Sequence, residues 1–418
     1  MIFIYRILIN FIFIISPVII LFRIIKKKES IKRFKEKLCF FSKKRLKGKV
    51  IWFHGASVGE LQSIIPLLEK IDKNNKIKQI LITSNTLSSS KIIEKIKFKK
   101  IVHQFFPIDT NFLSNKFLQY WKPSAAFFID SEIWPNMVYN LKKKNIPITL
   151  LNGRITKKTY KKWKKFPKFS NNIFSQLDLC LSSSQKSKNY LKKLGVRKIK
   201  FIGNLKFSQS ENEKIILDKN FKQFISSKKI WCASSTHRSE EQFCGLVHKK
   251  LNKKYKNLLT IIIPRHIERV GEIENKLKDM NLTVHNLEPT KKINNNTNIY
   301  IVNSYGKTKS FYNVCKNVFL GGSLIDHGGQ NPLEAARYGC NIMHGPNVSN
   351  FNEIYAFLKK NKISTRILSV NKMANTLDKF FSKKTNAKTI EKKLNKIGQN
   401  ILKNTYKEIN FIIKNNEV

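Results

Sequence analysis

The chain has few acidic residues. Its 418 residues include 27 Asp and Glu against 80 Lys and Arg, which gives a formal net charge of +53. This imbalance predicts attraction to a polyanion, either nucleic acid or an anionic membrane. Lys, Ile, Asn and Phe are abundant together, so AT-rich coding explains the basic excess equally well.

Cysteine is scarce, and no C-x-x-C pair occurs, which argues against a zinc cluster. Several cysteines fall in or beside apolar runs, as buried reduced thiols of a cytosolic domain do. The six are Cys39, Cys180, Cys232, Cys244, Cys315 and Cys340.

The chain also lacks a repeat of 20–50 residues, which argues against a solenoid. It lacks a module in which aromatic and basic residues interleave, so we expect no nucleic-acid partner. No paired-acid metal motif stands out, and we predict a site without metal. The length instead suggests two or three ordinary domains.

One long apolar run stands at the start of the chain. Residues 2–25 are mostly Ile, Phe, Leu and Val. A helix of this length is long enough to cross a bilayer. Basic residues follow at once, so a membrane anchor over 1–25 predicts that the rest of the chain is cytosolic. No small-residue cleavage site follows, which disfavours a signal peptide. An interfacial helix is the alternative, and the basic juxtamembrane segment 26–49 is expected against lipid headgroups.

From Val50 onward, short apolar runs alternate with helical periodicity, which is typical of βαβ units. A polar stretch near 208–220 reads as a linker. We therefore predict an α/β fold with two Rossmann-like doubly wound domains, over 50–208 and 221–418, and ligands at the strand carboxyl ends in a cleft between them. The predicted strands are Val50–Phe53, Gln79–Thr83, Ile101–Phe105, Ala125–Ile129, Pro147–Leu151, Leu179–Ser182, Ile199–Ile202, Ile230–Ala233, Leu258–Ile263, Ile299–Val302, Val318–Leu320 and Asn341–Met343.

Polar residues follow the predicted strands of the first half. Ser57-x-x-Glu60 reads as a capping box, and Glu60 is also a candidate general base. The helix N-terminus favours ionised Glu60, so desolvation has to raise its pKa again. Glu132 follows another strand and offers a second acid. Lys206 follows a Gly turn, where it is either a solvated lysine or a phosphate contact.

The second half carries a glycine-rich junction. Gly321-Gly322 ends a predicted strand, and Asn331-Pro332-Leu333-Glu334 follows as a predicted helix start. Such a junction lets the backbone approach a phosphate. Glu334 is either the acid of the cap or a ligand of ribose hydroxyls.

A basic residue ends another run of the second half. Arg265, after Pro264, suits bidentate phosphate recognition. A surface ion pair with Glu268 is the alternative.

Read in order, these junctions resemble the 3-deoxy-D-manno-octulosonic acid (Kdo) transferase family. The resemblance extends from Trp52 to Phe351, nearly the whole part after the apolar run. The matching stretches are WFHGASVGE, SEIWPN, LLNGRIT, GNLKF, ASSTHRSEE, IIPRHIERV, GGSLIDHGGQNPLEAA and GPNVSNF. It implies the GT-B architecture and transfer of Kdo from CMP-Kdo to a lipid A precursor (lipid IVA) at the inner face of the inner membrane.

The resemblance also implies roles for single residues. Glu60 matches the proton acceptor, and Glu132 and Lys206 match positions that stabilise the transition state. The matches to CMP-binding segments are Pro264, Arg265, Tyr305, Gly306, Lys307, Asn331, Pro332, Leu333 and Glu334. At the third segment Gly306 is kept, whereas Lys307 replaces the family's acid.

We expect an inverting reaction, because the nucleotide departs and the acceptor attacks on opposite faces of the sugar. The expected partners are CMP-Kdo, the lipid acceptor and inner-membrane lipids, with no cofactor. Another GT-B sugar-nucleotide enzyme and a basic nucleic-acid-binding protein are the alternatives. The sequence is silent on the number of Kdo units, the acyl pattern of the acceptor and the oligomeric state.

Overall fold

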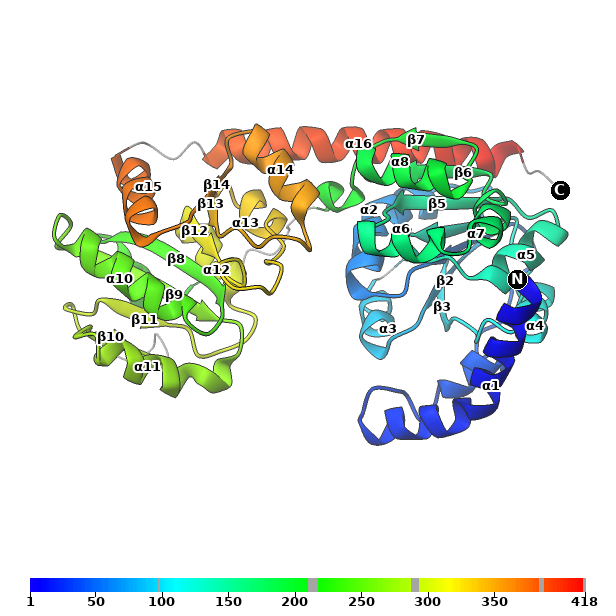
Figure 1. Cartoon of the computed structure of the whole chain (residues 1–418), viewed down its shortest axis with the longest axis horizontal. Coiled ribbons are helices and arrows are strands. Elements are labelled where there is room, and N and C mark those ends of the chain that lie inside the picture. Colours follow the sequence, from blue (N-terminus) through cyan, green and yellow to red (C-terminus); the bar gives the residue numbers. More distant parts are fainter. Residues whose placement is uncertain (97, 210–216, 287–292, 383–386, 416–418) are drawn as a thin grey trace. The chain divides into compact units, whose positions relative to one another are not determined.

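The computed structural model describes residues 1–96, 98–209, 217–286, 293–382 and 387–415. The chain divides into two compact units (Figure 1). Unit 1 comprises residues 1–209 and 397–418, and unit 2 comprises residues 210–396. Part of the predicted linker, 210–216, lies outside the described residues.

Unit 1 is built on a parallel sheet of seven strands in the order β3-β2-β1-β4-β5-β6-β7. Residues 50–54, 79–84 and 125–129 are buried throughout, as strands covered on both faces require. The strands are β1 (Val50–His54), β2 (Gln79–Ser84), β3 (Ile101–Phe105), β4 (Ala125–Ile129), β5 (Ile148–Gly153), β6 (Leu179–Ser182) and β7 (Ile199–Phe201).

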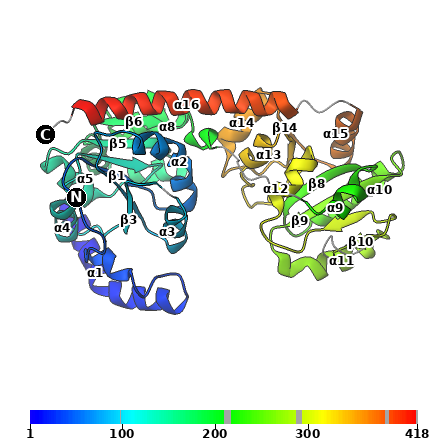
Figure 2. The same ribbon diagram turned by 180° about the vertical axis from the view of Figure 1, so that it is seen from behind.

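Helices cover both faces of this sheet, so unit 1 has two cores (Figures 1 and 2). Trp52 and Phe128 face the core under α4, α5, α7 and α8, while Phe53 and Phe127 face the core under α2 and the chain's last helix, α16 (Ala387–Asn415). The helices are α1 (Ile2–Ile25), η1 (Phe34–Leu38), α2 (Val58–Asp72), α3 (Leu87–Glu94), α4 (Asn111–Trp121), α5 (Pro135–Lys143), α6 (Lys157–Lys164), α7 (Pro167–Phe174), α8 (Gln185–Leu194) and η2 (Leu205–Ser208).

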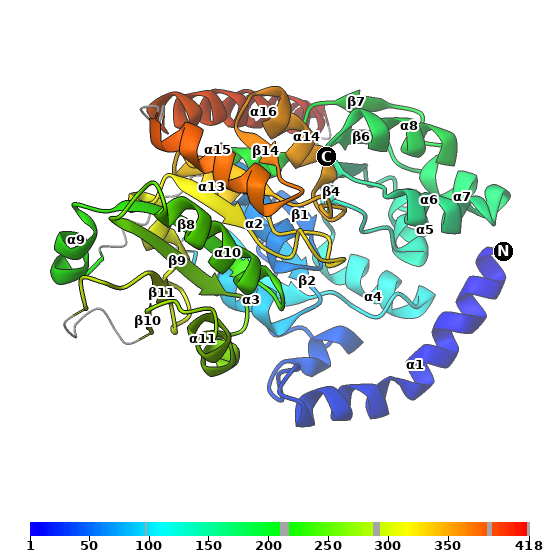
Figure 3. The ribbon, with the colours of Figure 1, turned by 60° about the vertical axis from the view of Figure 1, so that its left-hand side comes forward.

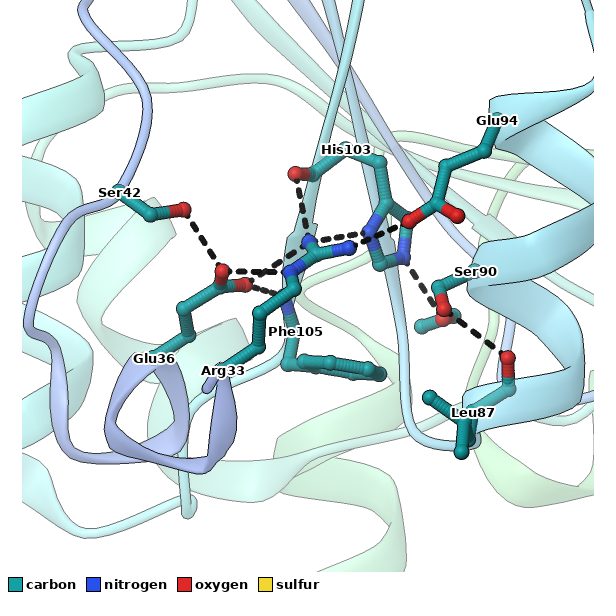
Figure 4. A network of polar contacts seen from close by, with 9 residues as sticks. Arg33, Glu36, Ser42, Leu87, Ser90, Glu94, His103 and Phe105 are labelled. Atoms are coloured by element: carbon teal, nitrogen blue, oxygen red, sulfur yellow. Dashed lines mark hydrogen bonds and ion pairs between the residues drawn. The ribbon is translucent and has the colours of Figure 1, made fainter. Parts of the chain in front are cut away.

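The basic segment 26–49 is partly folded onto the sheet edge. Arg33 bonds to Glu36 at 2.8 Å, to Glu94 at 2.7 Å and to the carbonyl of His103 at 3.0 Å (Figure 4). Glu36, which is buried, accepts the backbone N–H of Phe105 at 2.8 Å. These bonds tie η1 to β3, so only part of the segment is left to meet lipid headgroups.

Unit 2 contains a second parallel sheet of seven strands, in the order β10-β11-β9-β8-β12-β13-β14. Two of its strands, β10 and β14, were not predicted, because runs of two or three residues carry too little periodicity. The strands are β8 (Lys229–Thr236), β9 (Leu258–Pro264), β10 (Val284–His285), β11 (Ile299–Ile301), β12 (Asn317–Leu320), β13 (Asn341–His344) and β14 (Ser364–Arg366).

One core of unit 2 packs α10, α11 and α15 against this sheet around buried Trp231 and Phe319 (Figure 3). The helices are α9 (Lys219–Ile225), α10 (Glu240–Asn252), η3 (Ile267–Arg269), α11 (Val270–Lys278), α12 (Thr308–Val314), α13 (Leu333–Arg337), α14 (Asn352–Lys360), α15 (Val370–Ser382) and α16 (Ala387–Asn415).

The chain's last helix is divided between the two units, whereas the predicted second domain included all of it. Residues 397–418, expected in the second domain, belong to unit 1. Ile401 and Ile409 join the core over α2, and a Cβ on Gly398 would lie 2.2 Å from the carbonyl oxygen of Phe207. α16 is 29 residues long, and its apolar stripe is buried where the helix packs against the open face of the unit 1 sheet.

All six cysteines are buried free thiols, as predicted.

Candidate functional site

In unit 1 the strand order reverses between β1 and β4, which are neighbours. Ligands of open α/β sheets lie at such a switch point, beyond the strand carboxyl ends. Glu60 follows β1, and Glu132 follows β4. The fold therefore brings the two acids of the sequence prediction to the same edge of the sheet.

Glu60 completes the predicted capping box of α2. The Ser57 hydroxyl accepts the backbone N–H of Glu60 at 3.4 Å, and the Glu60 carboxylate accepts the N–H of Ala56 at 2.8 Å. Burial, and then the negative charges of Glu132 and Asp130, raise the pKa of Glu60 to about 7, against the hydrogen bond from Ser57. The capping role and the raised pKa therefore coexist, because burial outweighs the hydrogen bonds that stabilise the ionised form.

Glu132 is held by an aromatic donor. The Trp134 indole N–H lies 3.0 Å from Glu132 Oε2 and 3.1 Å from His54 Nε2. His54 Nδ1 lies 2.9 Å from the Thr83 hydroxyl, and burial lowers the pKa of His54. His54 Nε2 also lies 3.4 Å from Glu132 Oε2, so the indole, the imidazole and the carboxylate form one cluster. Neither His54 nor Trp134 was predicted as a site residue, although both lie inside the quoted motifs.

Two residues with left-handed backbone conformations, Asp130 and Asn152, link the sheet edge to the segment that carries Lys206. Asp130 and Asn152 have φ values of 62° and 53° at the ends of β4 and β5. Asn152 donates to Asp130 at 2.8 Å and accepts the N–H of Leu205 at 2.9 Å. Burial raises the pKa of Asp130, while the charges of Lys206 and Arg154 oppose the rise. Lys206 thus contributes a cation to the acid-lined edge.

The predicted donor residues of unit 2 also converge on one sheet edge. Four adjacent strands, β11, β9, β8 and β12, are parallel, so the loops after them share an edge. Tyr305, Gly306 and Lys307 follow β11, and Arg265 follows β9, where its N–H bonds to the carbonyl of Thr236 at 3.0 Å. Pro264 is the last residue of β9.

The Arg265 side chain is exposed, and within the described ranges it forms no ion pair with Glu268. Glu268 instead contacts His266 at 3.3 Å and the Tyr305 hydroxyl at 3.4 Å. The ion pair considered from the sequence is therefore absent, and the guanidinium is available to an anion.

The segment after the glycine-rich junction starts one residue later than expected. α13 begins at Leu333, whose N–H bonds to the Asn331 side chain at 3.2 Å. Pro332 precedes the helix as its N-cap residue, and Glu334 lies in its first turn.

Glu240 organises the glycine-rich loop, and it was not predicted. Its buried carboxylate accepts four backbone N–H groups. They belong to His237 at 3.0 Å, Gly322 at 2.7 Å, Ser323 at 3.1 Å and Leu324 at 3.0 Å. The same packing requires Gly321, because a Cβ there would lie 2.4 Å from the carbonyl oxygen of Ser235.

Three histidines gather at this loop. The His237 ring lies 4.4 Å from the His327 ring and 6.0 Å from the His266 ring. Burial, and then the charges of His327, His266 and Arg265, lower the pKa of His237 to about 4. The guanidinium of Arg265 lies near this cluster and is the permanent cation among these groups.

The two Rossmann-like sheets, each with polar junctions at its carboxyl edge, give the chain the GT-B fold. Residues 32–209 match a family model described as 3-Deoxy-D-manno-octulosonic-acid transferase (kdotransferase). The chain is 31% identical over 370 residues to the 3-deoxy-D-manno-octulosonic acid transferase of Rickettsia bellii, covering 86% of each chain. The chain belongs to the 3-deoxy-D-manno-octulosonic acid transferase family.

Other relatives extend this similarity. The transferase of Haemophilus influenzae is 27% identical over 84% of this chain and 83% of its own. A probable mitochondrial member from Arabidopsis thaliana is 31% identical over 88% and 86%.

Solved structures agree on the fold. A glycosyltransferase from Rickettsia africae has a TM-score of 0.58 at 13% identity, over 88% of this chain and all of that one. A UDP-GlcNAc 2-epimerase from Neisseria meningitidis bound to UDP-GlcNAc also has a TM-score of 0.58, at 15% identity over the same shares.

Proposed function

We propose that the protein transfers Kdo from CMP-Kdo to a lipid A precursor, lipid IVA, in lipopolysaccharide biosynthesis. Family membership supports Kdo transfer. The observation that carries the finer proposal is a half-buried carboxyl, Glu60, whose pKa is raised to about 7 beside a second acid at the switch point. A base of this pKa is half ionised near neutrality, where general-base catalysis works best.

In the proposed reaction, Glu60 removes the proton from an acceptor hydroxyl as the oxygen attacks the anomeric carbon of Kdo. The bond from that carbon to the CMP phosphate oxygen breaks, and CMP leaves with the electron pair. Attack opposite to departure inverts the anomeric centre. Glu132 and Lys206 stabilise the charges of the transition state from the same sheet edge. The step requires neither a metal nor a cofactor.

Unit 2 is proposed to bind the donor. Arg265 offers a bidentate guanidinium to the phosphate. The backbone at Gly306 and the Asn331–Glu334 segment supply further contacts. Lys307 stands where the family has an acid, and we propose that its positive charge attracts the CMP phosphate.

We place the enzyme at the cytosolic face of the inner membrane. α1 is long and apolar enough to cross a bilayer, with a mean hydropathy of 2.5. The acceptor is a lipid, so attachment through α1 brings the enzyme to its substrate.

The test is to incubate the purified full-length protein with CMP-Kdo and lipid IVA and to measure the lipid mass. An added Kdo mass supports the proposal. No change with CMP-Kdo, or the same change when UDP-GlcNAc replaces it, would overturn the proposed donor. Glu60→Gln serves as the inactive control.

A further inference from the structure

The N-terminal end of α1 is bonded to the body of unit 1. The Tyr5 hydroxyl donates to Asp109 Oδ2 at 2.8 Å, and Asp109 is buried between α4 and α5. Arg6 donates to Asn136 at 3.0 Å and to Asn111 at 3.1 Å. The first two turns of α1 therefore lie against the β3–α4 connection and the start of α5.

The carboxyl end of α1 is bonded to the same body. Arg23 pairs with Glu29 at 3.2 Å, and the side chain of Glu29 is completely buried. The Lys37 side chain bonds to that same carboxylate. The backbone carbonyl of Lys37 accepts the N–H of Ile108 at 3.0 Å. Ile108 is the residue before Asp109, so both ends of α1 are linked to one connection.

This arrangement decides between the two forms of membrane attachment that the sequence left open. A helix of 24 residues is about 36 Å long, and crossing the hydrocarbon core uses about 30 Å of it. A spanning α1 would carry Tyr5 to the far side of the bilayer from Glu29. Tyr5 could then not reach Asp109, and two polar attachments would be lost.

The surface left on α1 is apolar along most of its length, with Asn10 as an exposed polar residue. Thirteen large apolar side chains and Met1 are at least 38% exposed. Contact of so large an apolar surface with water is unfavourable. They are Phe3, Ile4, Ile7, Leu8, Phe11, Ile12, Ile14, Ile15, Val18, Ile19, Leu21, Phe22 and Ile25. Figure 3 shows α1 as a curved ribbon on the outside of unit 1. Pro17 lies in the second half of this helix.

Basic residues flank both ends of this apolar surface. Exposed lysines at 26, 27, 28, 32 and 35 follow its carboxyl end. Near its amino end, Tyr5 lies 6.2 Å from Phe169, ring to ring, at the start of α7. α6, just before α7, has no buried residue and carries five lysines. Each basic group near an anionic lipid surface adds on the order of 1 kcal/mol.

We propose that α1 lies in the plane of an anionic phospholipid membrane surface, with its exposed apolar side chains among the acyl chains and both ends held by unit 1. The flanking lysines contact the lipid headgroups. The enzyme is then monotopic, and its N-terminus lies on the same side of the membrane as its two units. The inference rests on the proposed membrane location but not on the chemistry of transfer.

The first experiment measures the sidedness of the N-terminus. A cysteine tag is added before Met1 of the full-length chain, and Lys28→Cys, in the exposed turn after α1, is the matched control. In sealed inverted inner-membrane vesicles, a membrane-impermeant maleimide should label both positions equally without detergent. The six native cysteines are buried and give a low background. Labelling of the control alone, with the tag reacting only after detergent, would show that α1 spans the membrane and would overturn the inference.

A second experiment tests the amino-terminal attachment itself. Arg6→Cys with Asn111→Cys should crosslink through a short bis-maleimide in the membrane, because the two side chains are in contact. Ile25→Cys with Asn111→Cys is the control and should not. Absence of the first crosslink in protein that retains Kdo transfer would overturn the inference and spare the proposed function.

Flotation with vesicles separates the two proposals further. Vesicles of phosphatidylglycerol and phosphatidylethanolamine should bind the protein at least tenfold better than vesicles of phosphatidylcholine alone. Equal binding would contradict the role of the lysines. No binding to either vesicle would overturn the membrane location itself.

Discussion

The hydroxyl of Ser57 donates to the carboxylate of Glu60 at 2.8 Å while accepting the backbone N–H of the same residue at 3.4 Å. This reciprocal pair fixes the first turn of α2 and aims the acid at the switch point. The hydrogen bonds favour the ionised form of Glu60, but burial outweighs them. The residue is therefore ordered like a cap, while burial raises its pKa to about 7.

Replacing this acid should separate binding from turnover. Glu60→Gln keeps the size of the side chain but cannot accept a proton, so kcat should fall at least about 100-fold while CMP binding is unchanged. Steady-state kinetics and calorimetry with CMP check this. Glu69→Gln, at an exposed position of the same helix, should behave as wild type. Near-normal turnover of Glu60→Gln would leave Glu60 as a cap only.

The raised pKa of Glu60 predicts a pH dependence of the rate. The base works when ionised, so kcat/KM should rise with pH and level off above about 7. If kcat/KM instead levels off near pH 4.5, the pKa of the Glu60 carboxyl is not raised and this prediction is wrong.

The same shift predicts a pH dependence of stability. The folded pKa of about 7 lies above the ordinary 4.5, so Glu60 contributes stability at low pH and loses it as pH rises through 7. At pH 8 Glu60→Gln should be more stable than wild type by roughly 1–3 kcal/mol, and the gain should vanish below pH 4.5. Denaturant unfolding at both pH values measures it.

Arg265 should contribute to donor affinity. Arg265→Ala removes an exposed guanidinium from the carboxyl edge of the second sheet, and the Kd for CMP should rise about tenfold or more. Lys254→Ala, on the surface just after α10 in the same unit, is the control. Unchanged affinity in Arg265→Ala would reject the phosphate contact.

Glu240 should act on the donor through the loop that it holds. Glu240→Gln replaces one acceptor oxygen by an N–H₂ group and leaves buried backbone N–H groups without a partner. We expect a loss of about 1–3 kcal/mol of stability and a raised KM for CMP-Kdo with little change in the KM for the lipid. Glu272→Gln, on the surface of α11, controls for charge. Equal effects on both KM values would indicate a general structural role.

Trp134 should position Glu132. Trp134→Phe keeps an aromatic ring but removes the N–H that bonds to Glu132 and His54. We expect kcat to fall about tenfold with unchanged CMP affinity, on the scale of one hydrogen bond to a charged group. Phe169→Leu, an aromatic change at α7, should leave kcat unaltered. A wild-type rate in Trp134→Phe would show that Glu132 needs no such donor.

Local chemistry explains why so much could be predicted. The buried strands are continuous runs of apolar residues, so their number and parallel direction follow from periodicity and spacing, as for Val50–His54 and Leu258–Pro264. The capping box at Ser57 and Glu60 is likewise visible within four residues. By contrast, β10 and β14 are too short to be recognised.

The remaining features depend on contacts between distant segments. Glu240 reads as an ordinary first-turn acid until Gly322 is folded against it, and α16 reads as part of the second domain until unit 1 offers an apolar face. For α1 the sequence determined a long apolar helix flanked by lysines, because composition sets hydropathy. Only the tertiary structure decided that both its ends are tied to one connection, because Tyr5 and Asp109 are 104 residues apart and their bond exists only in the folded chain.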